Sequence, residues 1–532
     1  METLDDLFRR LEQLNDIGAS LSNERDINRL LEKILLAAKA ITGADGGTLY
    51  QLSEDKRHLH FEIVRTDSLG IAFGGTSGQP TSGKFPDLDL YLADGSANDN
   101  MVAAYAALNA KTVNIPDAYE AEGFDFSGTR KFDARTGYRS QSFLTVPMQN
   151  HEGEIIGVLQ LINSLDPATG KVGAFSQADQ RLAESLASQA AIALTNRQLV
   201  EQLETLFESF IKLINLAIDE KSPYTGGHCQ RVPELTMMLA DAVDATTEGP
   251  LADVKLTEKD RYELRIAALM HDCGKVTTPV HVVDKATKLQ TIFDRIHLID
   301  TRFEVVRRDA EVAMWRAIAE GKDRASAEAE IARFCRQIEV DRSTLRRSNV
   351  GSERMSDDDV AAVRAIATRY RWQNPEGEWV DFLSAEELEN LTIRAGTLTQ
   401  AEREIINYHI VATIKMLEQL PWPKHLKNVP EYAGGHHERM DGKGYPKGLK
   451  REEMSWQARM MGIADIFEAL TAKDRPYKEP MKLSEALRVM ENFKNNGHID
   501  PDLFEIFRSQ TIFLKYAEGF LSESQLDCGT VA

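Results

Sequence analysis

The sequence predicts a multidomain protein in which an α+β domain, with a central antiparallel sheet and flanking helices, is joined by a long helix to an all-α domain. Three observations support this fold class. The chain has 532 residues, more than the roughly 100 to 200 that one hydrophobic core usually organises. Strand-like runs occur between residues 46 and 163, and a proline-free helical pattern follows from Phe175 to about Lys221. Beyond Pro223 the pattern is helical to the end.

The first elements are two amphipathic helices. Residues 4–21 place leucine and isoleucine at steps of three and four, which is the apolar stripe of an α-helix. A second helix follows, with Ser22 or Asp26 as its candidate N-cap. Four strands come next, because apolar and polar residues alternate or cluster between turn signals. These strands begin near residues 46, 58, 141 and 154, and the last two form a predicted hairpin.

The long helix carries the repeat of a coiled coil. Its apolar residues alternate at steps of four and three, at Leu199, Leu203, Leu206, Phe210, Leu213 and Ala217. This spacing predicts a short coiled coil and a homodimer. The alternative is a helix that packs on its own domain, because fewer than three heptads are clean.

The all-α domain contains an insertion over residues 288–395, whose charged, helix-forming sequence carries no evident chemistry. We interpret it as a solvated helical excursion or lid. The expected organisation is an N-terminal helix, the α+β domain, a coiled-coil linker helix, the helical domain and a C-terminal tail. Their residues are 1–23, 24–195, 196–221, 222–515 and 516–532.

Composition and charge exclude several classes of protein. The chain has 63 Lys and Arg against 83 Asp and Glu, a net charge of −20, which argues against a general electrostatic grip on nucleic acid or on an acidic membrane. No apolar stretch is long enough to cross a bilayer, and the amino-terminal residues resemble neither a signal peptide nor a transit peptide. Four cysteines without CxxC spacing fit a reducing compartment. We therefore expect a cytoplasmic protein.

Five histidines of the helical domain occur beside aspartates, in the arrangement that metal ligands take. They are His228, His271, His409, His436 and His437, with Asp272 and Asp465. The adjacent His271 and Asp272 can face one metal or bridge two. Without a metal, these groups would repel as they charged and would leave donors and acceptors unpaired. Mixed nitrogen and oxygen ligands suit iron, manganese, zinc or nickel rather than calcium.

Three strings of this domain resemble the HD-GYP family of cyclic dinucleotide phosphodiesterases. They are HDCGK at 271–275, HHERMDGKGYP at 436–446 and ADIFEALTAKDRPYK at 464–478. The resemblance extends over roughly residues 205–510. It implies that His228, His271, Asp272, His409, His436, His437 and Asp465 are the metal ligands.

The resemblance also implies the number of metals. Members that bind three metals carry a glutamate four residues before the first histidine, and here Tyr224 takes this position. We therefore predict two divalent ions bridged by Asp272, with iron or manganese first and zinc or nickel as alternatives. Two such ions about 3.5 to 4 Å apart activate water for in-line attack on phosphorus and neutralise charge on the phosphoryl oxygens.

Further residues of these strings are implied to contact substrate. Lys275 resembles the family lysine that contacts a substrate phosphate, and we predict that it is catalytic together with Asp272. Arg475 and Lys478 resemble a distal phosphate clamp, displaced here by one residue. A predicted recognition loop, linked in the family to contacts with diguanylate cyclase domains, contains Asp441, Gly442, Gly444, Tyr445 and Pro446.

The N-terminal domain resembles a GAF domain of the kind found in cyclic-nucleotide phosphodiesterases. FDARTGYRSQSFLTVPM at 132–148 and GVLQLIN at 157–163 carry the likeness. Of the spaced NKFDE motif of that group, Asn163, Phe175 and Asp179 match, whereas Ser164 and Gln180 replace the lysine and the glutamate. The domain is therefore interpreted either as a receptor for a small ligand such as a cyclic nucleotide or as a pocket-free dimerisation module.

These features predict a GAF-regulated phosphodiesterase that hydrolyses cyclic di-GMP to pGpG and leave onward cleavage to GMP open. One alternative is the same chemistry on another cyclic dinucleotide, such as cyclic GMP-AMP, because base recognition lies in residues that the sequence does not identify. The other is a low-turnover receptor or adaptor for the dinucleotide or for a cyclase. Tyr224 and the insertion favour this second alternative, and the intact ligand set speaks against it.

Overall fold

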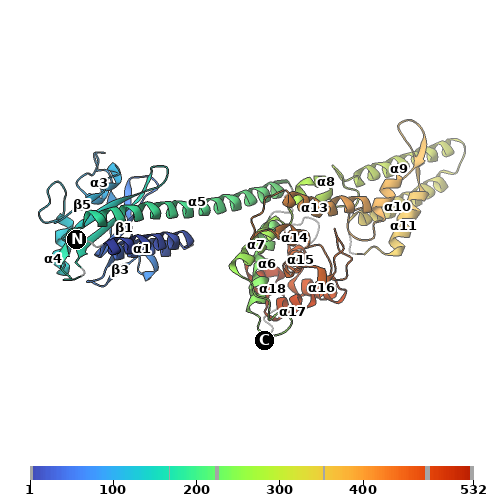
Figure 1. The fold of residues 1–532 in the computed structure, drawn as a ribbon. Helices are drawn as coiled ribbons and strands as arrows, with labels where there is room; N and C mark the ends of the chain where they lie inside the picture. The colour runs from blue at the N-terminus through green and yellow to red at the C-terminus, as the bar shows by residue number, and fades with distance from the viewer. Residues whose placement is uncertain are drawn as a thin grey trace. The chain divides into compact units, whose positions relative to one another are not determined.

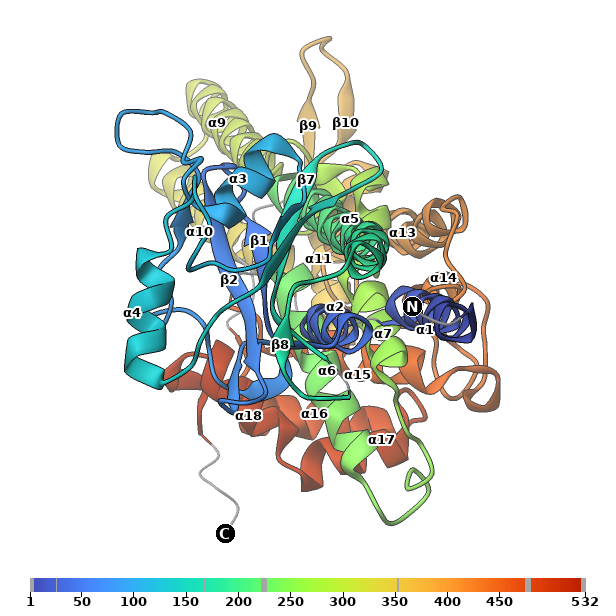
Figure 2. The same ribbon diagram turned by 60° about the vertical axis from the view of Figure 1, so that its left-hand side comes forward.

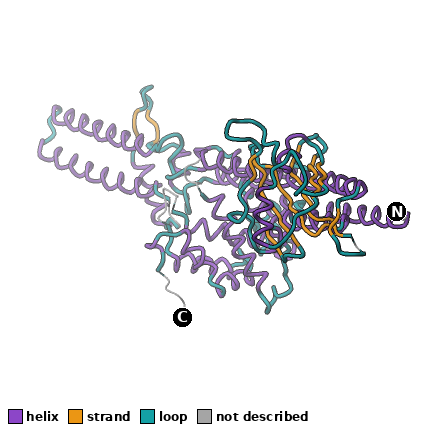
Figure 3. Tube along the Cα trace, turned by 90° about the vertical axis from the view of Figure 1, so that its left-hand side faces the viewer, coloured by secondary structure: helices purple, strands orange, loops and turns teal. Residues whose placement is uncertain are grey.

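The computed structural model describes residues 4–24, 26–166, 168–221, 227–351, 354–473 and 480–527. The chain forms two compact units, Met1–Phe207 and Glu208–Ala532. Figure 3 shows that the strands gather in the N-terminal unit, apart from one hairpin in the C-terminal unit. The predicted fold class, an α+β domain followed by a helical domain, is confirmed.

The N-terminal unit begins with two helices, α1 (Leu4–Asn23) and α2 (Ile27–Thr42). Of the two candidate caps, Asp26 is the one that accepts from the backbone N–H of Arg29, at 2.8 Å. Helix α2 ends at Gly43, whose φ of 66° lies in the left-handed region that glycine adopts without strain.

The sheet of this unit is antiparallel, in the order β3-β2-β1-β7-β6-β5, with β4 paired to β2 and β8 paired to β7. The predicted hairpin is β6 and β7, in which Phe143 pairs with Ile162. The strands are β1 (Ala44–Leu52), β2 (His58–Thr66), β3 (Ile71–Phe73), β4 (Leu88–Asp89), β5 (Val113–Ile115), β6 (Phe143–Gln149), β7 (Ile155–Leu165) and β8 (Val172–Gly173). The segment from 70 to 100 is mostly loop, with the short 3₁₀ helix η1 (Gly75–Ser77).

Helices cover both faces of this sheet (Figure 2). Helices α2 and α5 (Gln177–Lys221) pack on one face, where the core includes Ile34, Leu159 and Leu186. Helices α3 (Val102–Asn109) and α4 (Ser127–Thr136) lie toward the other face. Leu14 and Leu21 of α1 belong to the first core, so a boundary between residues 23 and 24 divides one packed unit.

Helix α5 is continuous from Gln177 to Lys221 and presents two different faces in its second half. Ile211, Asn215 and Ile218 are buried, and the side-chain amide of Asn215 donates to the Leu269 carbonyl at 2.8 Å. A row of apolar side chains remains exposed, and we call it the α5 stripe. It consists of Leu199, Leu203, Leu206, Phe210 and Leu213.

The C-terminal unit is built on helices whose starts carry clear caps. Thr257 and Asp260 form a capping box at α7, and Thr399 and Glu402 form another at α13. The elements outside the insertion are α6 (His228–Ala245), α7 (Glu258–Met270), η2 (Cys273–Thr277), α8 (Val280–Val283), α13 (Gln400–Glu418), α14 (Val429–Gly434), η3 (Arg451–Glu453), α15 (Trp456–Thr471), α16 (Leu483–Asn495), α17 (Pro501–Ser509), α18 (Ile512–Phe520) and η4 (Glu523–Gln525).

The end of this unit differs from the prediction of a tail from residue 516. Helix α18 crosses that position, and Tyr516 is buried. The Gln525 amide donates to the Thr471 carbonyl at 2.9 Å. Apolar residues at helical spacing continue to Phe520, so the packed part of the chain extends into the residues assigned to the tail.

The segment 288–395 folds around a core of its own. It contains α9 (Ile296–Ala319), α10 (Arg324–Asn349), α11 (Asp357–Arg369), β9 (Arg371–Gln373), β10 (Trp379–Asp381) and α12 (Ala385–Leu391). Figure 1 shows α9 and α10 lying side by side, and Phe303, Ile338, Val363 and Phe382 are buried between the elements. The β9–β10 hairpin corrects the expectation of an entirely helical domain, because two strands of three residues each leave no visible period in the sequence.

Candidate metal centre

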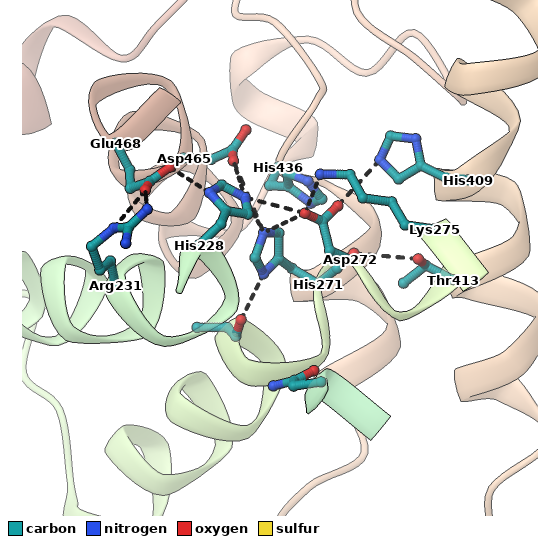
Figure 4. Close-up of polar contacts among 12 residues, drawn as sticks. His228, Arg231, His271, Asp272, Lys275, His409, Thr413, His436, Asp465 and Glu468 are labelled. Carbon is teal, nitrogen blue, oxygen red and sulfur yellow. Dashed lines mark hydrogen bonds and ion pairs between the residues drawn. The ribbon is translucent and has the colours of Figure 1, made fainter. Parts of the chain in front are cut away.

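Seven candidate ligands from five parts of the C-terminal unit meet in one place, and Figure 4 labels all of them except His437. His228 is the first residue of α6, and His271 with Asp272 follows α7 at the start of η2. The other ligands lie on or after the later helices. His409 is on α13, His436 and His437 follow α14, and Asp465 is on α15. The folding of these helices therefore brings together residues that are up to 237 positions apart in the chain.

One group of ligand atoms surrounds an oxygen of Asp272. Its Oδ2 lies 3.1 Å from Nε2 of His228 and 3.2 Å from Nε2 of His271. The two Nε2 atoms are 3.3 Å apart. Asp465 joins this group, because its Oδ1 lies 3.2 Å from Nε2 of His228.

A second group lies on the other side of Asp272. His409, His436 and His437 each place one ring nitrogen within 4.8 Å of the others. Oδ1 of Asp272 lies 3.3 Å from Nε2 of His409. The carboxylate of Asp272 therefore faces both groups, one oxygen toward each (Figure 4).

The hydrogen bonding of these side chains fits a metal site. Among the described residues, the buried atoms Asp272 Oδ1, His409 Nε2 and His436 Nε2 have no hydrogen-bond partner. Buried polar atoms without partners are rare because each costs free energy. Divalent cations with mixed nitrogen and oxygen ligands would satisfy all three atoms.

The other ring nitrogens of three histidines are held by the backbone. Nδ1 of His271 donates to the Ala268 carbonyl at 2.7 Å, and Nδ1 of His436 donates to the Ala433 carbonyl at 2.6 Å. Nδ1 of His409 donates to the Ile406 carbonyl. Each acceptor lies three residues before its histidine. Donation from Nδ1 leaves Nε2 with a lone pair for a metal.

Burial and charge shift the titration of the site. Burial lowers the pKa of His436 well below its usual value, aided by the neighbouring His437, and it lowers the pKa of His437 to about 4. Burial opposes the charge of Asp272, but the Lys275 ammonium and hydrogen bonds from His228 and His271 outweigh it and hold the pKa of that carboxyl well below its usual range. Both histidines are thus neutral and Asp272 is ionised near neutral pH, which are the forms that bind metal.

Lys275 lies beside the bridging carboxylate. Its Nζ forms an ion pair with Oδ2 of Asp272. Burial disfavours the ammonium, but Asp272 outweighs this effect and raises the pKa of Lys275. Lys275 therefore places a cation next to the candidate ligands.

A cavity of about 530 Å³ opens onto the ligands. It is lined by His228, Lys275, Ile406, Asn407, His409, His436, His437, Arg439, Lys443, Tyr445, Asp465, Ile466, Ala469, Leu470, Phe493 and His498. Within the described ranges, none of these residues comes from 288–395. The described residues of the insertion therefore supply no wall of this cavity, and a role for the insertion as a lid stays a prediction.

The predicted recognition loop runs along one side of this cavity. The ring of Tyr445 stacks on the ring of His437 with centroids 4.9 Å apart. Asp441 accepts two bonds from the Arg439 guanidinium, at 3.0 and 2.8 Å. Gly444 packs tightly on the backbone, because a Cβ there would lie 2.4 Å from the Arg439 nitrogen. The neighbouring Gly442 has a φ of 76°, and Pro446 follows a cis peptide bond.

Two residues that the sequence analysis did not identify support His228, Glu468 by direct contact and Arg231 through Glu468. Nδ1 of His228 donates to Oε2 of Glu468, and Arg231 Nε donates to Oε1 of the same carboxylate at 2.8 Å. Burial disfavours ionisation of Glu468, but His228 and Arg231 outweigh it and lower its pKa to about 2. The sequence offered one indication of this role, because Glu468 is a carboxylate one turn after Asp465 on an apolar helix. Tyr224, Arg475 and Lys478 lie outside the described residues.

The three matching residues of the NKFDE motif contact neighbouring parts of the N-terminal unit. The side-chain oxygen of Asn163 accepts from the backbone N–H groups of Gln141 and Ser142, at 2.7 and 3.2 Å. Phe175 is in the core under α5, and Asp179 accepts from the Ser176 backbone N–H at 2.9 Å. Their role toward a ligand stays a prediction.

Comparison with known proteins defines the class of this chain. Residues 26–194 match the GAF domain family, and residues 225–340 and 384–503 match the HD domain family. The chain therefore carries a GAF domain followed by an HD domain. The interval between the two HD matches, residues 341–383, lies within the insertion and contains the end of α10, α11, β9 and β10.

Three curated proteins illustrate the similarity. A 3′3′-cGAMP-specific phosphodiesterase of Vibrio cholerae is 38% identical over 111 residues, which are 21% of this chain and 23% of that protein. A cyclic di-GMP phosphodiesterase of Pseudomonas aeruginosa is 39% identical over 114 residues, 21% of this chain and 26% of that protein. A dual 3′,5′-cyclic-AMP and -GMP phosphodiesterase of Drosophila melanogaster is 33% identical over 206 residues, 39% of this chain and 13% of that protein. The chain thus spans about a quarter of the length of the two bacterial relatives.

None of the described helices is both long enough and apolar enough to span a membrane.

Proposed function

We propose that this protein is a metal-dependent phosphodiesterase that hydrolyses cyclic di-GMP to pGpG. One observation carries the proposal. The Asp272 carboxylate faces His228 and His271 with one oxygen and His409 with the other, and His228 and His409 line a cavity of about 530 Å³. A carboxylate between two clusters of imidazoles is the arrangement expected for two adjacent divalent ions.

The proposed ligands are the seven residues predicted from the sequence. His228, His271 and Asp465 would hold one ion, His409, His436 and His437 the other, and Asp272 both. Iron or manganese fits this set of nitrogen and oxygen donors, with zinc or nickel as alternatives. When bound, such ions activate water and neutralise charge on the phosphoryl oxygens.

The side chains of the site complete the chemistry. Lys275 places its ammonium beside Asp272 and is the proposed contact for a substrate phosphate. The ring of Tyr445 stacks on the imidazole of His437, holds that imidazole in place and shapes the neighbouring part of the cavity. Arg475 and Lys478 stay proposed as a distal clamp for the second phosphate.

There are two alternatives to hydrolysis of cyclic di-GMP at this site. The names of the curated relatives include both cyclic di-GMP and cGAMP phosphodiesterases, so cyclic GMP-AMP is the second candidate substrate. A low-turnover receptor is the third interpretation. Complete ligand geometry supports turnover over reception.

We also propose that the GAF domain regulates the HD domain in a cytoplasmic homodimer. The α5 stripe supports the dimer, because Leu203, Phe210 and Leu213 are 64%, 56% and 58% exposed at coiled-coil spacing. A second copy would bury them. Buried free thiols at Cys229 and Cys273 fit a reducing cytoplasm. A GAF ligand such as a cyclic nucleotide, and a diguanylate cyclase partner for the recognition loop, are further parts of the proposal.

The domain boundaries are proposed with the correction described above. The GAF domain then includes α1, and the HD domain extends through α18 and η4 and contains the insertion 288–395.

Metal content and hydrolysis, measured together on anaerobically purified protein, test the proposal. The wild type is expected to hold about two iron or manganese ions per chain and to linearise cyclic di-GMP, and Asp272→Ala is expected to lose both properties. Cyclic GMP-AMP is the parallel substrate. Bound metal with turnover of that dinucleotide alone would replace the substrate, and bound metal with no turnover of either would favour the receptor. Absence of bound metal would refute the mechanism.

A further inference from the structure

His228 differs from the other histidines in how its ring is oriented. The rings of His271, His409 and His436 are each held by a carbonyl three residues earlier. His228 is the first residue of α6, so no turn of that helix precedes it to supply such a carbonyl. Another acceptor must orient this ring, because an imidazole whose second nitrogen is unbound can rotate or change tautomer.

Glu468 is that acceptor. Its side chain is fully buried, and its Oε2 accepts from Nδ1 of His228. Its other oxygen accepts from Arg231, whose Nε and Nη2 lie at 2.8 and 2.7 Å. A buried carboxylate is costly without such pairing, and Arg231 supplies the compensating charge.

The positions of these residues in the chain give the contact its geometry. Arg231 lies three residues after His228 on α6, and Glu468 lies three residues after Asp465 on α15. One turn of each helix therefore brings a ligand and its supporting residue to the same side. The His228 ring is held at both nitrogens, by Glu468 at Nδ1 and by Asp465 and Asp272 at Nε2 (Figure 4).

We infer that Glu468, held by Arg231, is a positioning residue that fixes the ring and tautomer of His228 and strengthens metal binding by the group His228, His271, Asp272 and Asp465. The inference rests on the proposed metal centre. This support should give the two groups of candidate ligands different metal affinities, because an ionised carboxylate increases the donor strength of an imidazole more than a backbone carbonyl does. The group of His409, His436 and His437 has only carbonyl support among the described residues.

A simpler role for Glu468 would be to stabilise the packing of α6 against α15. A matched variant distinguishes this role from the positioning of His228. Glu263 on α7 is also a buried carboxylate, and it accepts from the Asn428 backbone N–H and side-chain amide at 2.7 and 3.2 Å. Glu263→Gln removes the same charge from a site that contacts no candidate ligand. It reports the effect of losing a buried carboxylate on stability alone.

Manganese binding to the full-length, metal-stripped protein tests the inference. Mn²⁺ titrations followed by calorimetry and by electron paramagnetic resonance are expected to show about two sites in the wild type. Glu468→Gln should weaken one site by roughly 10- to 100-fold and leave the other unchanged, while excess Mn²⁺ restores turnover. Arg231→Lys keeps the charge and should weaken binding less than Arg231→Gln. Glu263→Gln should leave both affinities unchanged whatever its melting temperature.

The outcomes distinguish this inference from the proposed function. Wild-type affinity at both sites in Glu468→Gln would overturn the inference while the metal centre stands. Equal losses in Glu468→Gln and Glu263→Gln would also overturn it, because a general loss of stability would then explain the result. A wild type that binds no Mn²⁺ would overturn the proposed metal centre itself.

Discussion

Asp272 and His409 face each other across 3.3 Å, from Oδ1 to Nε2, and neither buried atom has a hydrogen bond within the described part of the chain. Asp272→Asn keeps the shape of the side chain and removes its charge. Both groups of candidate ligands then lose the negative carboxylate that they share, so the metal bound by each group should decrease. Hydrolysis of cyclic di-GMP should drop by at least roughly 100-fold, measured by chromatography beside elemental analysis.

Asp309→Asn is the control for this change, because Asp309 is an exposed carboxylate on α9. It should keep wild-type metal content and turnover. An Asp272→Asn protein that retained about two metals and full activity would contradict the bridging role.

The metal-free protein should lose stability between about pH 6.5 and pH 4. The pKa of His437 is about 4 in the folded chain and about 6.5 when unfolded. The unfolded state therefore binds more protons in this window, so the free energy of unfolding falls as the pH falls, by up to about 3 kcal/mol for this residue. The lowered pKa of His436 acts in the same direction.

Urea unfolding of chelator-treated protein at pH 7 and pH 5 measures this effect. His437→Gln should show a smaller loss on acidification than the wild type. Glu468, with a pKa of about 2 against an ordinary 4.5, loses its contribution only below pH 4.5 and does not interfere in this range. A free energy of unfolding that stayed constant or rose on acidification would refute the assignment.

Lys285 attaches the insertion to the helix that carries His409. Its Nζ lies 2.7 and 2.8 Å from the two oxygens of Glu402 on α13 and 2.8 Å from Oδ1 of Asn390, and its side chain is 1% exposed. Lys285→Met leaves the Glu402 carboxylate without its cationic partner and should cost about 3 kcal/mol. Hydrogen exchange at α12 and at the start of α13 should accelerate.

The exposed ion pair of Lys322 and Glu330 provides the comparison, because exposed pairs contribute less than about 1 kcal/mol. Lys322→Met should leave exchange at α12 and α13 unchanged. Equal protection in Lys285→Met and the wild type would show that the insertion is held by other contacts.

The α5 stripe predicts the oligomeric state. Leu203→Glu and Phe210→Glu place charges in the centre of the proposed coiled coil and should convert a dimer to a monomer at micromolar concentration. Light scattering after size-exclusion chromatography measures the mass. Lys212→Glu, at an exposed position outside the stripe, should remain dimeric. A monomeric wild type would exclude the coiled coil.

Gly444 predicts how strictly the recognition loop is packed. A Cβ at this position would lie 2.4 to 2.6 Å from the backbone of Glu438 and Arg439, so Gly444→Ala must displace the loop and the Tyr445 ring. The kcat/KM for cyclic di-GMP should fall by roughly 10- to 100-fold. Gly519→Ala, where the added Cβ meets no atom within 4 Å, should have wild-type kinetics.

Much of the fold and the candidate ligands could be predicted because the relevant signals are local. The cap at Asp26 and the hairpin of β6 and β7 each follow from a short stretch of sequence. The candidate ligands could be found in the sequence because His271 with Asp272, and His436 with His437, are adjacent and lie within recognisable strings. The structure brings these strings to one site.

The supporting contacts were not predictable because they join residues far apart in the chain. Glu468 and His228 are separated by 240 positions, and neither neighbourhood indicates the other. The core of the insertion was hidden for a related reason, since Phe303, Ile338 and Phe382 come from separate elements with mostly charged surfaces. Tyr516 shows that a short apolar helix at the end of a domain is easily taken for a tail.

The two ends of the insertion lie next to each other. The Thr397 hydroxyl donates to the Lys285 carbonyl at 2.9 Å, and Lys288 Nζ donates to the Ile393 carbonyl at 2.8 Å. The chain enters and leaves this segment of about a hundred residues at neighbouring points of the HD domain. The segment can therefore occupy the place of a short surface loop. Such a segment can be lengthened, exchanged or deleted by recombination without moving α13, so catalysis and the excursion can evolve at different rates.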